Sequence, residues 1–226
     1  MKIQAIIAAA GLGTRLKASD PKPLIVMNQK PLLVYSLEVF EQCSLVDSVI
    51  VVVPQDSMMS FEQAVKDFHG KKKIKCVVGG SRRCDSVANG LKALDQDTQF
   101  VVVHDGARPF LMGELLAQCI VAAQENKAAI VAVPVKPTVK CVNLKSLTVE
   151  STLKREELWE IQTPQVFEKG ILLKAYEGLG SATPTDDAEL VERLGIRPKV
   201  VMGSYQNIKI TTQEDLAFAE FLLTKG

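Results

Sequence analysis

The chain has 226 residues, of which 47% are hydrophobic and 23% are charged, proportions that exclude the disordered and fibrous classes. Because 27 lysines and arginines nearly balance 26 aspartates and glutamates, the formal charge of +1 does not supply the basic field of a nucleic-acid coat. Aromatic residues, at 5%, offer little surface for stacking bases, so any nucleotide bound here should be a small one.

Short apolar, β-branched runs alternate along the chain with longer amphipathic runs. The apolar runs predict strands at Ile3–Ala9, Ser48–Val53, Ile74–Val78, Phe100–His104 and Ala128–Val133. The amphipathic runs predict helices at Pro31–Cys43, Ser57–His69, Asp85–Leu94 and Gly113–Glu125. Nearly continuous apolar strands between helices are typical of a parallel sheet that is covered on both faces. The sequence therefore predicts an α/β fold with a doubly wound, mostly parallel sheet.

The alternation changes after Val133. Residues 135–160 alternate loosely, with polar residues on both sides, and predict a hairpin whose turn lies near Asn143–Lys145. Because such an arm has no apolar face with which to dock on its own domain, it should be covered by a neighbouring subunit. We therefore expect one domain over residues 1–226, with residues 135–160 as a dimerisation β-arm.

A turn is expected after the arm, at Thr163-Pro164-Gln165, and the α/β pattern then resumes. Helices are expected near Glu168–Glu177 and Asp186–Leu194, and short strands at Lys199–Val201 and Ile208–Ile210. The last helix, Gln213–Leu223, should begin at Thr212 with a capping box to Asp215.

The five cysteines contain no C-x-x-C pair, and only two histidines accompany them, which argues against a zinc site. Most of them lie in apolar segments, as reduced buried thiols do, and this favours a reducing compartment. The N-terminal apolar run is too short for a signal peptide, and no run reaches the roughly 18 residues of a membrane span. We expect a cytoplasmic protein without a membrane or nucleic-acid partner.

The first predicted strand leads directly into a glycine-containing loop, Ala8-Ala9-Ala10-Gly11-Leu12-Gly13-Thr14-Arg15. Small residues let a backbone approach a ligand, and successive N–H groups can bind an anion. The dinucleotide fingerprint of dehydrogenases fails because Leu16 replaces its third glycine, and the P-loop lacks its Gly-Lys-Ser/Thr. Arg15 and Lys22 could meet phosphates here, although a tight turn with solvated basic residues fits the same stretch.

Two further motifs follow predicted strands. Gly79-Gly80-Ser81 opens a helix, where backbone groups could bind an anion or a nucleobase edge, although a capped turn is the commoner reason for such glycines. Asp105 and Arg108 come just past the fourth strand, where open α/β sheets bind their ligands. Asp105 could bind a hydroxyl group or Mg²⁺ and Arg108 a phosphate, or the two could form a structural ion pair.

Two polar residues stand in apolar strand patterns. His104, at the end of the fourth strand, is interpreted as a hydrogen-bonded core histidine without a catalytic role. Lys209 lies in a short apolar run, where a lysine is costly unless it faces a cleft that holds an anion. Lys209 is therefore the strongest single candidate outside the glycine loop.

Six motifs occur in order along the chain: AAAGLGTRL with Lys22, GGSRRCDSV, HDGARPF, TPQVF, TDDAELVE and NIKIT. Together they closely resemble the motifs of the 2-C-methyl-D-erythritol 4-phosphate cytidylyltransferases of the non-mevalonate isoprenoid pathway. The resemblance runs from Ile3 to about Leu223, and the ordered set is specific although each single motif is weak. It implies a Rossmann-like nucleotidyltransferase that transfers CMP from CTP to methylerythritol phosphate, with Mg²⁺, and releases pyrophosphate. One departure is Pro23, where many relatives have glutamine.

The resemblance also implies roles for individual residues. The implied catalytic residues are Lys22, Lys209 and Arg15. The implied CTP-binding residues are Ala9, Ala10, Gly11, Gly13, Gly80, Ser81, Ser86 and Asp105, of which Asp105 also meets the metal. The implied methylerythritol phosphate site contains Gly106, Arg108, Thr138, Arg155, Thr163 and Thr185. In the implied homodimer, the arm of one subunit delivers Thr138 and Arg155 to the site of the other.

Other functions share parts of this pattern. A cytidylyltransferase acting on ribitol 5-phosphate would have the same loops, and a nucleotide-binding regulatory module would keep the fold without catalysis. The motifs TPQVF and TDDAELVE favour the isoprenoid enzyme, while Lys22, Lys209 and Asp105 together favour catalysis. Phosphoryl substrates arrive ionised, so such an enzyme needs alignment and charge neutralisation rather than a general base.

Overall fold

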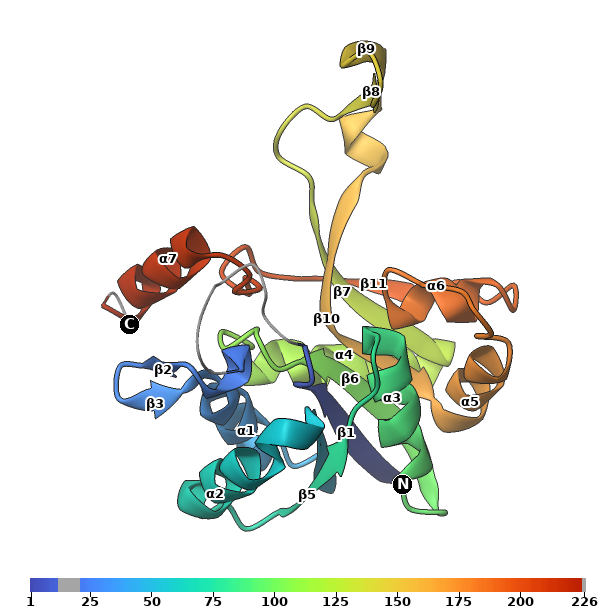
Figure 1. Ribbon diagram of the computed structural model, residues 1–226. Helices are drawn as coiled ribbons and strands as arrows, with labels where there is room; N and C mark the ends of the chain where they lie inside the picture. Colours follow the sequence, from blue (N-terminus) through green and yellow to red (C-terminus); the bar gives the residue numbers. More distant parts are fainter. Residues whose placement is uncertain (12–20, 225–226) are drawn as a thin grey trace.

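A single mixed sheet organises the chain (Figure 1). Within residues 1–11 and 21–224, the part that the computed structural model describes, seven strands form this sheet in the order β11-β7-β10-β6-β1-β4-β5. β10 runs antiparallel to its neighbours β6 and β7, whereas the pairs β1–β4, β1–β6, β4–β5 and β7–β11 are parallel. The predicted α/β class with a mostly parallel sheet is confirmed.

The elements follow one another closely along the chain. The strands of the main sheet are β1 (Lys2–Ala8), β4 (Ser48–Val53), β5 (Lys73–Val78), β6 (Thr98–Asp105), β7 (Ala128–Pro134), β10 (Trp159–Glu168) and β11 (Lys199–Met202). Two small ribbons pair β2 (Val26–Met27) with β3 (Lys30–Pro31) and β8 (Lys140–Asn143) with β9 (Thr148–Thr152). The α-helices are α1 (Leu32–Gln42), α2 (Met58–Phe68), α3 (Arg83–Lys92), α4 (Gly113–Asn126), α5 (Lys169–Glu177), α6 (Asp187–Glu192) and α7 (Gln213–Leu223). Short 3₁₀ turns are η2 (Lys22–Leu24), η3 (Gln55–Ser57) and η4 (Arg155–Glu157).

Alternate residues of the buried strands pack into two apolar clusters, one on each face of the sheet. On β1, Ile7 packs into the cluster that contains side chains of α1, α2 and α4, whereas Ile6 packs with α3, α5 and α6. Both isoleucines are fully buried. A strand that is buried on both faces must be apolar at every position, which is why these segments were recognisable in the sequence.

Two predictions in the C-terminal half are wrong. Thr163-Pro164-Gln165 was expected in a turn but lies within β10, between β7 and β6. The register of β10 against β7 shifts between Ile161 and Gln165, and the Thr163–Pro164 peptide bond is cis. Such an irregularity accommodates a proline that cannot donate a ladder hydrogen bond. Ile208–Ile210 was expected as a strand but is an irregular segment, which the N–H of Ile210 ties to the carbonyl of Ala107 at 2.8 Å.

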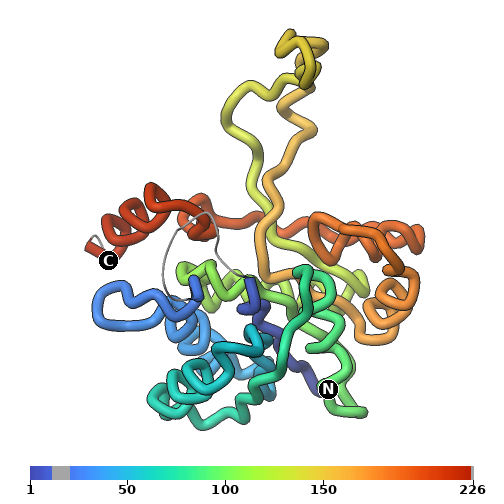
Figure 2. Tube along the Cα trace, in the orientation of Figure 1, coloured from blue at the N-terminus to red at the C-terminus, as the bar shows by residue number. Residues whose placement is uncertain are grey.

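The predicted hairpin is present and projects from the sheet, as the tube in Figure 2 shows. Its turn covers residues 144–147, close to the predicted Asn143–Lys145. The end of the predicted range belongs to the main sheet, since Trp159 and Glu160 pair with β7. The alternation of residues predicted a hairpin without an apolar face. The structure differs, because the hairpin exposes the apolar side chains of Val142, Leu144, Leu147 and Val149.

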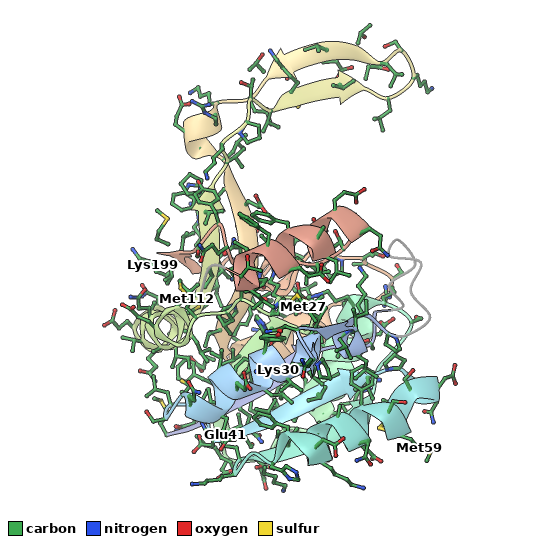
Figure 3. The ribbon with its side chains drawn as sticks, turned by 90° about the vertical axis from the view of Figure 1, so that its left-hand side faces the viewer. Met27, Lys30, Glu41, Met59, Met112 and Lys199 are labelled. Atoms are coloured by element: carbon green, nitrogen blue, oxygen red, sulfur yellow. The ribbon has the colours of Figure 1, made fainter. Side chains whose placement is uncertain are left out.

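A third apolar cluster fixes the C-terminal segment against the start of the chain. Ala219 of α7 and Ile210 pack with Met27 and Leu32, and Figure 3 labels Met27 beneath α7. The predicted capping box begins α7: the Thr212 hydroxyl accepts from the Asp215 N–H, and the Asp215 carboxylate accepts from the Thr212 N–H. This cluster brings residues 208–211 beside η2, which begins at Lys22.

Helix α3 lies very close to the sheet at Gly90, and this contact predicts the effect of a substitution. A Cβ atom at Gly90 would lie 2.7 Å from Cγ2 of Ile6 and 3.1 Å from Cγ2 of Val52. Alanine would gain about 1 kcal/mol of helix propensity, but overpacking a tight core costs about 1–3 kcal/mol. We expect Gly90→Ala to lower the free energy of unfolding by about 1 kcal/mol, measured by urea denaturation.

The matched control is Gly113→Ala at the start of α4, where a Cβ atom would meet nothing within 4 Å. It should be as stable as the wild type or slightly more stable. A Gly90→Ala protein that matched this control would contradict the close packing of α3.

Candidate active site

A cavity of about 660 Å³ opens where β1, β4, β5 and β6 end. The carboxyl ends of parallel strands are the usual position of a ligand crevice in open α/β sheets. The cavity wall comes from Ala8–Gly11, Lys22–Pro23, Pro54–Asp56, Gly79–Arg83 with Ser86, Asp105 with Ala107, and Lys209 with Thr211.

The cavity brings together most of the residues implied in CTP binding and catalysis. Its lining includes Ala9, Ala10, Gly11, Lys22, Gly80, Ser81, Ser86, Asp105 and Lys209. Gly13 and Arg15 lie outside the residues that the structure describes. The two glycine motifs thus face one space, although about 70 residues separate them in the sequence.

The residues implied in methylerythritol phosphate binding are more scattered. Gly106, Arg108 and Thr163 lie around Asp105 behind the cavity wall, and the Thr163 hydroxyl accepts from the Asp105 N–H at 3.1 Å. Thr138 and Arg155 are exposed on the arm, where Arg155 donates to the Lys136 carbonyl at 3.0 Å. Thr185 is exposed and donates to Glu189. Thr138, Arg155 and Thr185 do not line the cavity within one chain.

The second glycine motif is a turn clamped by Ser86. The Ser86 Oγ accepts from the Gly80 N–H at 3.1 Å and donates to the Arg82 carbonyl at 3.1 Å. A Cβ atom at Gly80 would overlap the Cβ of Asp85, so only glycine fits this close approach. Asp85 accepts from the Arg82 N–H and so caps α3, as the sequence suggested as one alternative.

The carboxylate of Asp105 is the electrostatic centre of the cavity. Among the described residues, three cations surround it: Nε of Arg83 lies 3.0 Å from Oδ1, while Nζ of Lys209 and Nε of Arg108 lie 2.7 Å and 3.7 Å from Oδ2. Burial would raise the pKa of Asp105, but these charges outweigh it and hold the pKa well below its usual range. The ion pair with Arg108, one of the alternatives, is therefore only part of a larger cluster with excess positive charge.

The two candidate lysines approach the cavity from opposite ends of the chain. Nζ of Lys22 donates to the Thr211 carbonyl at 3.5 Å, two residues beyond Lys209. The Lys209 side chain is 38% exposed and faces the cavity, as its position in an apolar run predicted. Two lysines beside a carboxylate that is already neutralised make this end of the cavity suitable for phosphate groups.

Sequence analysis missed Arg83 and Asp187. Arg83 lines the cavity and contacts both Asp105 and the buried Asp187, whose Oδ2 lies 2.9 Å from NH1 of Arg83. A signal was present, because Asp187 shares its helix face with Leu190 and Val191, which are three and four residues further on and are buried. An acid on an apolar helix face requires a cationic partner, and the second arginine of GGSRRCDSV is that partner.

Comparison with known proteins agrees with this geometry. The family model described as IspD, 2-C-methyl-D-erythritol 4-phosphate cytidylyltransferase, matches residues 3–225. The chain belongs to this family. A curated member from Alkaliphilus metalliredigens is 45% identical over 99% of this chain and 94% of its own length. Another, from Caldanaerobacter subterraneus, is 43% identical with both chains fully covered.

Solved structures of the family share the fold. The 4-diphosphocytidyl-2C-methyl-D-erythritol synthase of Anaerococcus prevotii superimposes with a TM-score of 0.87 at 36% identity, covering 99% of this chain and 96% of that one. The 2-C-methyl-D-erythritol 4-phosphate cytidylyltransferase of Thermus thermophilus gives a TM-score of 0.79 at 29% identity, covering 99% and 100%. The family resemblance inferred from the six sequence motifs is confirmed. Over the described residues, this cytidylyltransferase-family chain has no helix with the length and apolar character to cross a membrane.

His104 of this family member is a core residue, as predicted. It is fully buried, with Nδ1 3.0 Å from the Thr163 hydroxyl and Nε2 3.2 Å from the Arg108 carbonyl. Burial lowers the pKa of His104 to about 4, so the ring is neutral near pH 7. Its ring nitrogens therefore support the backbone around Asp105 rather than carry a proton for the reaction.

The lowered pKa of His104 makes stability depend on pH. Since the value of about 4 lies below the ordinary 6.5, the unfolded chain takes up a proton in this window while the folded chain does not. Stability is therefore fully present above pH 6.5 and is lost as the pH falls toward 4. We expect the free energy of unfolding, from urea titrations, to fall by about 2 kcal/mol between about pH 7 and pH 5. His104→Asn should be less stable at pH 7 but should lose this slope; an unchanged slope would exclude His104 as its cause.

Proposed function

We propose that the protein transfers CMP from CTP to 2-C-methyl-D-erythritol 4-phosphate, giving 4-diphosphocytidyl-2-C-methyl-D-erythritol and pyrophosphate. Family membership supports this reaction, and one structural observation supports this cavity as the place where it occurs. The cavity at the strand ends brings together Ala9–Gly11, the glycine turn at Gly80, Lys22, Lys209 and the neutralised Asp105. That combination suits a ribonucleoside triphosphate, whose phosphates need cations and whose base needs close backbone contact.

The proposed chemistry is an in-line displacement at the α-phosphorus of CTP. A phosphate oxygen of the second substrate forms the new P–O bond, the bond from the α-phosphorus to the bridging oxygen breaks, and pyrophosphate leaves. Lys22 and Lys209, which both line the cavity, would stabilise the negative charge that develops on the α-phosphate and the leaving group. The attacking phosphate is already ionised, so the reaction needs no proton acceptor and leaves His104 outside the chemistry.

The two glycine motifs have separate proposed tasks. The small residues Ala9, Ala10 and Gly11, with Gly13 and Arg15, would contact the triphosphate. The turn at Gly80 and Ser81, fixed by Ser86, would contact the cytosine through its backbone groups. Asp105 would bind the ribose region, where its position is held by Arg83 and by the Thr163 hydroxyl.

We also propose that Mg²⁺ accompanies the triphosphate. Within the described residues, no group of three or more His, Cys, Asp or Glu side chains could hold a metal ion by itself. Mg²⁺ in phosphoryl-transfer sites commonly uses one or two carboxylates with substrate phosphates and water, so the single carboxylate of Asp105 fits that need. Each oxygen of the Asp105 carboxylate has two lone pairs, so it can bind a metal ion in addition to the cation that it already contacts. Bound Mg²⁺ would neutralise phosphate charge.

The second substrate site is proposed to form across a homodimer in the cytoplasm. Gly106, Arg108 and Thr163 lie beside Asp105, while Thr138, Arg155 and Thr185 would complete the site. The exposed apolar side chains of Val142, Leu144, Leu147 and Val149 support an arm that packs on a partner subunit. The reducing cytoplasm suits a chain whose thiols at Cys43, Cys84 and Cys119 are buried and unpaired.

Release of pyrophosphate from CTP tests the reaction. We expect release with 2-C-methyl-D-erythritol 4-phosphate and little with ribitol 5-phosphate. Lys22→Ala and Lys209→Ala should each lower kcat by about two orders of magnitude or more with the fold intact, as removal of a transition-state donor does. Lys30→Ala is the matched control, because Lys30, labelled in Figure 3, pairs with Glu38 and does not line the cavity. Near-normal kcat in either cavity variant, or faster reaction with ribitol phosphate, would reject the assignment.

Subunit mixing tests the shared site. An Arg155→Ala subunit mixed with a Lys22→Ala subunit should regain about a quarter of wild-type activity, since half of the dimers are mixed and each of these holds one intact site. Mixing Lys22→Ala with Lys209→Ala is the control: both lysines line the cavity of one chain, so every site stays defective. No recovery after verified subunit exchange, or a monomeric protein at working concentration, would refute action of Arg155 across the dimer.

A further inference from the structure

A line of polar contacts runs from the cavity into the interior between α3, α5 and α6. Arg83 contacts Asp105 through Nε at 3.0 Å and Asp187 through NH1 at 2.9 Å. The Tyr176 hydroxyl donates to the other oxygen of Asp187. Burial and the charge of Asp187 raise the pKa of Tyr176, which keeps this hydroxyl protonated as a donor.

Asp187 is an unexpected residue at its position. Its side chain is 1% exposed, and it does not line the cavity. A buried ion pair is a poor source of stability, because apolar residues of similar volume often serve as well or better. The proposed reaction gives Asp187 no contact with either substrate, so a different reason is needed for a charge at this depth.

The position of Arg83 supplies that reason. A guanidinium on the wall of a cavity that binds a triphosphate would be attracted to the phosphates and could leave Asp105. Asp187 holds the opposite side of the same guanidinium: its Oδ2 forms an ion pair with Arg83 without a hydrogen bond of good geometry, and its Oδ1 accepts from Tyr176. This second contact would keep Arg83 on Asp105 when anionic substrates enter.

Strand β10 fixes the backbone on both sides of this arrangement. The Thr163 hydroxyl accepts from the Asp105 N–H at 3.1 Å. Two residues later, Gln165 donates to Asp186 at 2.9 Å and accepts from the Ala188 N–H at 3.1 Å. The residues on either side of Asp187 are thus bound to the same strand that holds Asp105.

We infer that Asp187 is a positioning residue of the cytidylyl transfer: acting through Arg83, it keeps the Asp105 carboxylate in the orientation that the reaction requires. The inference rests on the proposed function and assigns a task to the second aspartate of TDDAELVE. Asp187 touches no substrate, so its loss should lower kcat without weakening the binding of CTP.

Asp187→Asn tests this with almost no change of shape, since the amide oxygen can still accept from Tyr176. We expect kcat for pyrophosphate release to fall by about 10- to 100-fold, as for outer partners of catalytic groups, with KM for CTP changed less than about threefold. CTP affinity from calorimetry should stay equal or rise, because Arg83 becomes free to reach the phosphates. Glu192→Gln is the matched control: it removes a carboxylate charge from an exposed side chain of the same helix, and kcat should stay within about twofold.

A double-variant cycle separates positioning from a general structural effect. In an Arg83→Met background, Asp187→Asn should cause no further loss of kcat, because Asp187 acts through Arg83. Additive losses, or an Asp187→Asn kcat equal to that of the wild type, would overturn the inference.

If Asp187→Asn does not fold, Tyr176→Phe is the second test, because it keeps the charge of Asp187 and removes only the hydrogen bond. The kcat of Tyr176→Phe should still fall at unchanged KM, and a normal kcat would overturn the inference. Absence of turnover in the wild type would instead reject the proposed function itself.

Discussion

The buried carboxylate of Asp105, with Arg83, Arg108 and Lys209 around it, is the interaction on which the rest of the site depends. An unpaired carboxylate at this depth would be strongly unfavourable, and without it the three cations would repel one another. Three cations against the carboxylates of Asp105 and Asp187 leave an excess of one positive charge beside the cavity. Charge complementarity of this kind is what a polyphosphate substrate requires, and it is already in place before the substrate arrives.

The Asp105–Arg108 pair, Arg83 and Lys209 come from different parts of the fold. Asp105 ends β6, Arg83 begins α3, and Lys209 follows β11, so the cluster forms only when the two edges and the centre of the sheet are assembled. The segment before Lys209 also supports the base of the arm, since the Tyr205 hydroxyl donates to the Pro134 carbonyl at 2.7 Å. The ammonium of Lys136 lies 3.4 Å from the centre of the Tyr205 ring. The segment from Tyr205 to Lys209 thus contacts the base of the arm and also carries a lysine of the cavity.

The site contains charge and close backbone approach but no acid–base pair. His104, the histidine nearest the cavity, is neutral and hydrogen-bonded inside the core. The glycine turn at Gly80 depends on Ser86, whose hydroxyl is used to hold the turn. These features agree with a reaction between ionised phosphates, in which the protein aligns the groups and stabilises charge.

The sequence alone predicted six of the seven described strands of the main sheet, the seven described α-helices and the family. Short, continuous, β-branched apolar runs between amphipathic helices favour strands that are covered on both faces, and glycines or aspartates directly after such strands lie at the strand ends. Local pattern did not reveal β10, because its antiparallel insertion between β6 and β7 and its proline at an irregularity are set by long-range pairing. Nor did it join Arg83 to Asp187, which lie about 100 residues apart and meet only when α3 and α6 pack on the same face of the sheet. Tertiary structure decided these contacts, since a buried charge acquires its partner from packing and not from its neighbours in sequence.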